Sequence, residues 1–213
     1  MEMKDFETLF GKYNENLQLA DPKLLNYYLD LEKRTFWIDD DVTEDLLDLV
    51  KLIIRWNMED DKKKLPVEKR TPIKIFFFSP GGHLEINYTV YDAIKMSHTP
   101  VIGINVGQCA SAAAYIFLAC HKRYMFEHAY FLFHQGSGAF RGSYGEILSH
   151  MEDYQNQVKE LGSLLIDNTK YTADEVGEKI VGEWYVRAEE AVEKGIVAKV
   201  ITDLNENNWE AAE

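Results

Sequence analysis

The stretch 101–120 constrains the fold most strongly, because it joins two apolar runs of different character. Its first part, Val101 to Val106, is rich in β-branched residues and predicts a strand. Small residues follow Gly107, and the apolar segment after them predicts a buried helix over 111–120. Ser111 stands at the junction, where a strand that turns sharply into a helix exposes the first-turn residue beside free backbone N–H groups. A nucleophile or an anion site is expected at such a junction.

Apolar runs with strand character alternate with amphipathic segments along the rest of the chain. We expect strands over 34–38, 73–78, 100–106, 123–126, 129–133 and 196–201, and helices over 84–97, 143–168 and 188–194. Another helix is expected after Thr43, which can cap a first turn that holds Glu44 and Asp45. The charged, Pro-broken segment from Glu59 to Arg70 predicts a solvated surface loop. The alternation predicts an α/β fold with a largely parallel sheet and surrounding helices.

The length of 213 residues suits one domain with a sizeable core. Residues 1–30 are acidic, with scattered aromatic side chains and no strong period, so we expect an N-terminal arm there. The domain itself is expected over 31–204, followed by a C-terminal tail over 205–213.

The net charge of −13 disfavours nucleic acid and anionic membrane surfaces as partners. Both cysteines, Cys109 and Cys120, lie in the apolar stretch and are expected to be reduced. The longest apolar segment, 110–120, is too short to span a bilayer, and the first 16 residues lack the features of a signal peptide. We therefore expect a cytoplasmic protein.

Three local features could form a site. Ser79-Pro80-Gly81-Gly82 follows a predicted strand, and its glycines favour a nest of backbone N–H groups, although the same residues also make an ordinary turn. Ser111 is a candidate nucleophile, although a serine at a helix start is more often a cap. His134 ends a predicted strand and is a candidate general base, although a histidine that serves only packing or a turn is commoner.

Other kinds of site are not indicated. The remaining histidines and the cysteines lack metal-ligand spacing, so we predict no metal and no cofactor; those histidines are His83, His98, His121, His128 and His150. A Walker-type phosphate loop is absent, and the residues around Ser111 lack the two glycines of the G-x-S-x-G elbow.

Four segments occur in the order typical of one family: FSPGGHLEINYTVYDAI, VGQCASAAAYI, FHQGSGAFRGSYGEI and EWYVRAEEAVEKGIV. Together they resemble the ClpP family of serine peptidases over roughly residues 34 to 203, in particular the divergent members found in phage and mobile elements. The resemblance implies a crotonase-like α/β fold and hydrolysis of peptide bonds in unfolded polypeptides. It also implies that Ser111 is the nucleophile, that His134 is the general base, and that the N–H groups of Gly82 and Ala112 form the oxyanion hole.

The resemblance extends to substrate binding and assembly. The helix over 143–168 matches the long protruding handle helix of the family, and the glycine-rich segment before it matches the strip that pairs with substrate backbone. The implied substrate-binding residues are Gly81, Gly136, Ser137, Gly138, Ala139 and Phe140. The implied assembly is a homo-oligomer, either a heptameric ring or a double ring, and an AAA+ unfoldase is a candidate partner.

The chain departs from the family pattern at the acid of the triad. The family has an aspartate there, whereas counting back from Ala188 without gaps reaches Glu183. A glutamate can orient a histidine, but its extra methylene moves the carboxylate by about 1 Å, and a displacement of that size can cost about a hundredfold in rate. Another acid such as Asp174, or no acid, is the alternative. The family's Ser-Met-Gly and His-Gln-Pro are also altered, to Ser111-Ala112-Ala113 and His134-Gln135-Gly136.

Three functions are therefore compared. The first is a serine endopeptidase that works inside a ring chamber. The second is a catalytically silent ring subunit, suggested by the changed acid and the missing proline. The third, an acyl-CoA enzyme of the crotonase type, ranks last because it explains neither Ser111 nor His134.

Overall fold

The computed structural model describes residues 22–205 and divides the chain into two compact units after Lys33. The described part of the first unit forms α2 (Pro22–Glu32), which includes the end of the predicted arm. The rest of that arm and nearly all of the predicted tail lie outside the described residues. The second unit, which begins at Arg34, holds the elements discussed below.

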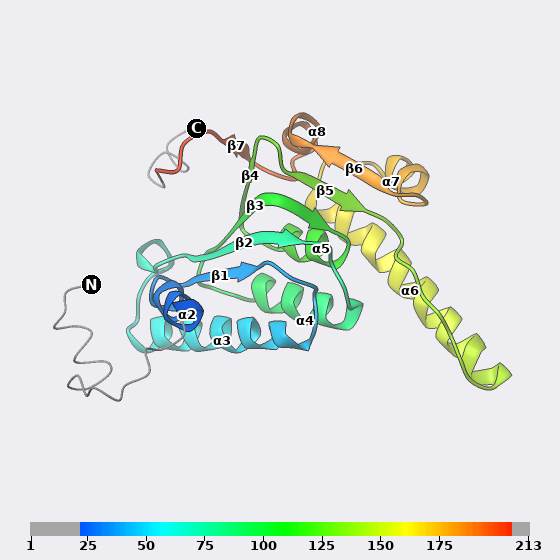
Figure 1. Cartoon of the computed structure of the whole chain (residues 1–213), viewed down its shortest axis with the longest axis horizontal. Coiled ribbons are helices and arrows are strands. Elements are labelled where there is room, and N and C mark those ends of the chain that lie inside the picture. The colour runs from blue at the N-terminus through cyan, green and yellow to red at the C-terminus, as the bar shows by residue number, and fades with distance from the viewer. Residues whose placement is uncertain (1–21, 206–213) are drawn as a thin grey trace. The chain divides into compact units, whose positions relative to one another are not determined.

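Strands and helices alternate through the second unit, which confirms the predicted α/β class (Figure 1). Its elements are β1 (Thr35–Ile38), η1 (Glu44–Leu46), α3 (Leu47–Lys62), η2 (Val67–Lys69), β2 (Ile73–Ser79), α4 (Leu84–Lys95), β3 (Val101–Ala110), α5 (Ala112–Leu118), β4 (Lys122–Phe126), β5 (Tyr130–Phe133), α6 (Tyr144–Asn168), α7 (Ala173–Lys179), β6 (Trp184–Arg187), α8 (Ala188–Glu193) and β7 (Lys199–Ile201).

Within residues 22–205 the strands form one seven-stranded sheet with the order β1-β2-β3-β4-β7, and β5 branches from β3. All pairings are parallel except the one between β5 and β6, so the predicted largely parallel sheet is confirmed. β3 is forked: Ile102–Asn105 pairs with β4, whereas Gln108–Ala110 pairs with β5.

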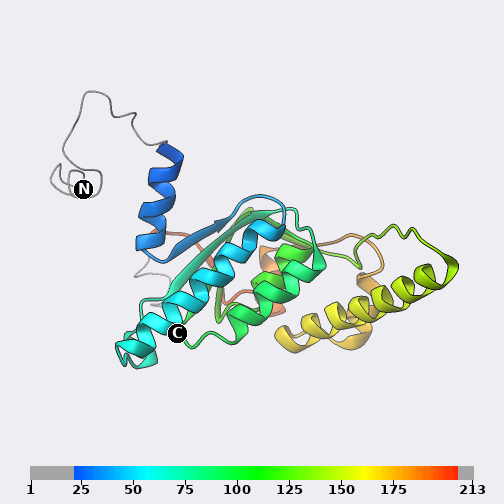
Figure 2. The ribbon, with the colours of Figure 1, turned by 90° about the horizontal axis from the view of Figure 1, so that it is seen from below.

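Helices α3, α4 and α5 lie side by side against one face of the sheet (Figure 2). α3 buries a stripe at helical spacing that includes Leu49, Ile53 and Trp56, and every residue of α5 is buried. Fully burying one large apolar side chain stabilises a fold by about 1.5–3 kcal/mol. The helix behind Ser111 is therefore fixed to the core along its whole length.

α6 is the long protruding helix that the sequence predicts. Ser143 and Glu146 form a capping box at its start, and its buried residues, Leu161 and Leu165, lie near its end. The opposite half runs away from the sheet (Figure 1) and exposes Tyr144, Leu148 and Met151. The buried residues that anchor the helix to the domain thus lie in its C-terminal half.

Some predictions about local structure are wrong. The segment predicted as a solvated loop begins inside α3, and Asp60 within it is only 1% exposed. Arg34 compensates for the burial of this carboxylate by donating two hydrogen bonds to it, at 2.6 and 2.7 Å. Thr43 precedes η1, but its side chain makes no capping hydrogen bond. The sequence did not predict α7 or β6.

Candidate active site

Parallel pairing brings the three candidate motifs to one edge of the sheet. β2 and β3 stay paired up to Ser79 and Cys109, and β3 and β5 stay paired up to Ala110 and Leu132. The glycine pair, Ser111 and His134 therefore follow the carboxyl ends of three neighbouring strands. Ligands bind at this edge in open α/β sheets.

Ser111 has a backbone conformation that side-chain-bearing residues rarely adopt. Its φ of 51° and ψ of −128° lie outside the usual regions, which costs about 1–3 kcal/mol. Its N–H donates to Leu132 O at 2.8 Å, and its side chain makes no capping hydrogen bond to α5. The alternative that Ser111 is simply a helix cap is thus wrong. The sharp turn from strand to helix instead presents the hydroxyl at the end of the strand, as nucleophile elbows do.

His134 lies in hydrogen-bond contact with Ser111. The distance between His134 Nε2 and Ser111 Oγ is 2.8 Å, within the range that a general base needs. Both residues are partly exposed, so a substrate can reach them. A neutral imidazole with its proton on Nδ1 can accept the serine proton at Nε2.

Cys109 is a potential nucleophile two residues before Ser111, but burial excludes it. Its side chain is fully buried, and desolvation raises the pKa of its thiol well above the ordinary value. A reactive cysteine needs a thiolate at neutral pH. Cys109 is therefore a core residue.

The glycine pair lies directly against the serine. Gly81 has a φ of +98°, and a Cβ on it would lie 2.6 Å from Ser111 Cβ and 2.9 Å from Ala112 N. Gly82 forms a parallel bridge with Val42, in which Val42 N donates to Gly81 O and His83 N donates to Val42 O. The N–H of Gly82 takes no part in this bridge and points away from Val42. The sequence alternative of an ordinary turn does not account for this close approach.

Two backbone donors stand next to the serine. Among residues 22–205, the N–H groups of Gly82 and Ala112 have no hydrogen-bond acceptor. Ala112 is the first residue of α5, where the N–H groups of a helix lack partners within the helix. Paired donors of this kind can stabilise an oxyanion.

The glycine-rich strip after His134 runs beside α6 (Figure 1). Gly136 adopts a φ of +84°, and Phe140 packs its ring against His150 and Tyr154 of α6, with centroid distances of 6.1 and 5.8 Å. Ser137, Gly138 and Ala139 between them are exposed and belong to no strand. Their backbone groups are available to pair with an extended peptide.

The acid of the site is not in contact with the base. Tyr185 Oη donates to Glu183 Oε2 at 2.8 Å, and within residues 22–205 no hydrogen bond or ion pair joins either Glu183 or Asp174 to His134. Asp174 is exposed in the first turn of α7. The assignment of the acid therefore stays a prediction.

Sequence reasoning missed several polar side chains around the site. Tyr154 Oη donates to Gln135 O at 3.0 Å, Tyr115 Oη lies 3.5 Å from His134 O, and Tyr185 binds Glu183. A tyrosine in an apolar pattern is interpreted as a packing residue, so the sequence does not reveal that its hydroxyl forms a hydrogen bond at the site. Asn105, which donates to Tyr130 O at 2.9 Å, could have been found as a polar residue inside a buried strand.

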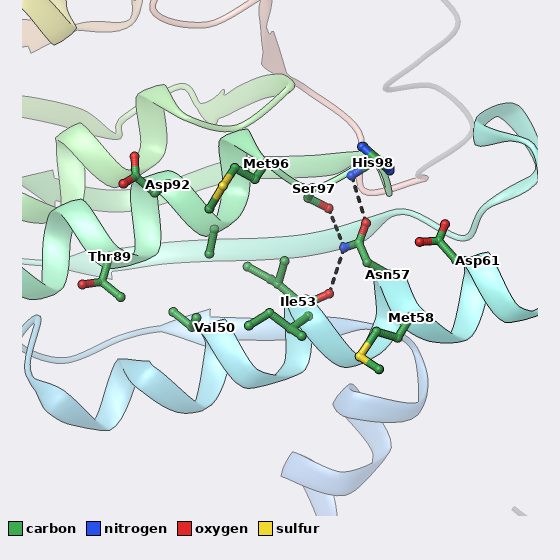
Figure 3. Close-up of a pocket in the computed structure, with 12 residues that line it drawn as sticks. Val50, Ile53, Asn57, Met58, Asp61, Thr89, Asp92, Met96, Ser97 and His98 are labelled. Carbon is green, nitrogen blue, oxygen red and sulfur yellow. Dashed lines mark hydrogen bonds between the residues drawn. The ribbon is translucent and has the colours of Figure 1, made fainter.

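A pocket between α3 and α4 lies apart from these residues (Figure 3). Asn57 holds its wall together by donating to Ile53 O and Ser97 Oγ and by accepting from the N–H of His98. None of the residues that line it belongs to the candidate site.

Two general findings apply to residues 22–205. In this range no cluster of three or more histidine, cysteine or acidic residues could hold a metal ion, and the predicted absence of a metal stays a prediction. In the same range no helix is both long enough and apolar enough to cross a membrane.

Comparison with known proteins agrees with this geometry. The family model described as Clp protease matches residues 41–204. The chain is 30% identical to ATP-dependent Clp protease proteolytic subunit 2 of Pseudomonas aeruginosa, covering 86% of this chain and 88% of the relative. Proteins of the same name from Chlamydia pneumoniae (29% identity, 84% and 85% covered) and Bifidobacterium longum (25% identity, 81% of each covered) also match.

Proposed function

The chain belongs to the Clp protease family, and we propose that it is a serine endopeptidase with Ser111 as its nucleophile. Family membership and the names of the relatives support a peptidase of the ClpP type. The main observation is the 2.8 Å contact between Ser111 Oγ and His134 Nε2 at a strained turn. If Ser111 and His134 served only packing, their side chains would not need to form this hydrogen bond.

The reaction proceeds through an acyl-enzyme. His134 Nε2 takes the hydroxyl proton as Ser111 Oγ attacks the carbonyl carbon of the peptide bond, and the oxyanion accepts hydrogen bonds from the N–H groups of Gly82 and Ala112. His134 then gives the proton to the leaving amine, and water releases the acyl group by the same steps in reverse order. One oxyanion donor contributes about 10²–10³ in rate.

Glu183 is our proposed third member of the triad. An acid must accept from His134 Nδ1 to hold the imidazole in its productive tautomer. Phe133 of β5 pairs with Trp184 of β6, and Glu183 and His134 are the residues directly beyond this last pair. This register supports Glu183 over Asp174.

The proposed substrates are unfolded polypeptides bound in extended form. The exposed backbone of 136–140 can add the substrate as a strand, and Gly81 allows its close approach to Ser111. Backbone pairing depends little on side chains, so broad sequence preference is expected.

The proposed assembly is a homo-oligomeric ring, heptameric or doubled, located in the cytoplasm. The exposed apolar side chains on the free half of α6 support a contact between copies, because such side chains are seldom left in water as a group. An AAA+ unfoldase is the proposed partner, since the relatives are named as subunits of ATP-dependent proteases.

A fluorophosphonate probe tests the nucleophile. We expect covalent labelling of Ser111, identified by peptide mass spectrometry, and hydrolysis of a small peptide ester. Ser111→Ala should lose labelling and reduce kcat by about 10⁶-fold. Ser163→Ala is the matched control, because Ser163 is an exposed serine on α6.

The outcomes separate the serine endopeptidase from the silent ring subunit. Labelling that persists in Ser111→Ala, or equal turnover by both forms, contradicts the proposal. A well-folded oligomer that takes up no probe identifies the silent ring subunit instead.

A further inference from the structure

Glu183 and His134 lie at the open end of the β5–β6 ribbon, next to its last pair. The antiparallel register ends with Phe133 opposite Trp184, and the next positions are His134 and Glu183. The two chains stay close beyond this point but leave the register, because Gln135 N donates to Ile180 O at 3.2 Å whereas the register would place residue 182 opposite Gln135. Directly opposite residues share a face of the ribbon and have Cβ atoms about 4.5–5.5 Å apart.

Tyr185 lies on the same face, two residues after Glu183. Its hydroxyl donates to Glu183 Oε2 at 2.8 Å, and this bond raises the pKa of Tyr185, so the phenol stays a proton donor. The ring is braced by Tyr130, at a centroid distance of 5.8 Å, and the guanidinium of Arg187 covers the Tyr130 ring at 4.8 Å. The hydroxyl is therefore held at a defined place beside the carboxylate.

A glutamate needs such a restraint more than an aspartate does. Its side chain has one more rotatable bond, and ordering that bond costs conformational entropy. An ionised carboxylate accepts up to about four hydrogen bonds, so Oε1 of Glu183 stays free when Tyr185 occupies Oε2.

We propose that Tyr185 is a positioning residue of the active site. Its hydroxyl holds Oε2 of Glu183 and leaves Oε1 to accept from Nδ1 of His134, a bond that is not formed in the structure. Tyr185 thereby compensates for the extra methylene that distinguishes Glu183 from an aspartate. The inference rests on the proposed function, because His134 has to act as the base.

The first test is kinetic and uses the full-length protein with a small peptide ester. Tyr185→Phe should lower kcat about tenfold with KM unchanged, since one hydrogen bond to a charged group is lost. Tyr130→Phe is the matched control, because it removes a hydroxyl from the same ribbon that makes no bond to Glu183 within the described residues. In a Glu183→Asp background, Tyr185→Phe should have little effect, because the shorter side chain does not reach Tyr185.

The second test does not need activity. In protein with ¹⁵N-labelled histidine, the Nδ1 proton of His134 should give a downfield NMR signal that Glu183→Gln abolishes. Tyr185→Phe should broaden or shift this signal, whereas Tyr130→Phe should leave it unchanged. The measurement works equally in Ser111→Ala protein.

The two readouts separate the possible failures. If the probe does not label wild-type Ser111 but the His134 signal depends on Tyr185, the proposed function is wrong, and only the structural coupling of Tyr185 to His134 through Glu183 stands. An unchanged or higher kcat in Tyr185→Phe, or a His134 signal insensitive to that substitution, overturns the positioning role.

Discussion

At the scale of single residues, the candidate site depends on the close contact of Ser111 with Gly81, because both have rare backbone conformations. Ser111 and Gly81 both have positive φ angles, of 51° and 98°. A side chain on Gly81 would overlap Ser111 Cβ and Ala110 O, each at 2.6 Å. The glycine is thus required both by its conformation and by the space that the serine occupies.

Gly81→Ala should therefore reduce both stability and activity. The added methyl group has to displace backbone atoms, so we expect at least about 2 kcal/mol of destabilisation and loss of most probe labelling. Gly145→Ala in α6 is the control, because nothing lies within 4 Å of its added Cβ and alanine favours a helix by about 1 kcal/mol. Urea unfolding and the labelling rate measure the two effects, and a labelling rate equal to wild type would contradict the close approach.

At the scale of elements, α6 helps to place His134, the proposed general base. Gln135, next to His134, is held on both sides: its N–H donates to Ile180 O, and its C=O accepts from Tyr154 Oη. A proline would rigidify this turn in a different way, but Gly136 has a φ of +84° that proline cannot adopt. Hydrogen bonds to α6 and to the end of α7 therefore restrain the turn after His134 in place of a proline.

Tyr154→Phe should release this restraint. We expect kcat for a peptide ester to fall up to about tenfold, while the free energy of unfolding changes by only about 1 kcal/mol. Tyr144→Phe serves as the control, since Tyr144 is 80% exposed at the start of the same helix. Full activity in Tyr154→Phe would show that α6 does not position the base.

The start of α7 makes a pH-dependent contribution to stability. Lys194 and the capping residue Thr172 hold the Glu175 carboxylate and lower its pKa to about 2, from an ordinary value of about 4.5. Since the folded-state pKa is depressed, the stabilisation is present above about pH 4.5 and disappears as the pH falls towards 2. The difference between the urea-unfolding midpoints of wild type and Glu175→Gln should become smaller as the pH falls from about 4.5 towards 2.

Glu178→Gln provides the comparison for that measurement, because Glu178 is an exposed acid in the same helix. It should show no such pH-dependent difference. A Glu175→Gln difference that stays constant from pH 6 to pH 3 would mean that the carboxylate charge is irrelevant.

The elements that the sequence predicted well are those with long, unambiguous patterns. α6 repeats one period over 25 residues, and the apolar run at 101–106 predicted the first part of β3. β3 continues beyond the predicted strand to Ala110, and these unpredicted residues are the ones that pair with β5. β6 was not predicted, although β1 and β5 are equally short. Asp60 was misassigned because its partner, Arg34, is 26 residues away, and local composition does not reveal such a pair. The contact of Glu183 with Tyr185 also could not be predicted, because it depends on the rotamers of the two side chains.

At the scale of the whole molecule, charge and assembly act against each other. Each chain has a net charge of −13, so copies that approach one another repel. The free half of α6 nevertheless exposes apolar side chains such as Leu148 and Met151. If burial of such surface drives the proposed ring, assembly has to overcome the repulsion.

Salt should therefore promote oligomerisation. The screening length falls from about 10 Å at 0.1 M salt to about 3 Å at 1 M, while apolar burial is not weakened. Sedimentation velocity should show a larger assembled fraction at the higher salt concentration. Dissociation by salt would contradict an apolar interface and point to intersubunit ion pairs.

The fork in β3 has a consequence for how the molecule loses function. The half of β3 that pairs with β4 belongs to the main sheet, whereas His134 follows a branch that pairs with β3 at only three positions. A short ladder opens at a lower free energy than a sheet core, so hydrogen exchange should be faster in β5 than in β2. If the branch opens first, His134 separates from Ser111 while the remaining strands stay folded, and loss of probe labelling on heating should precede global unfolding.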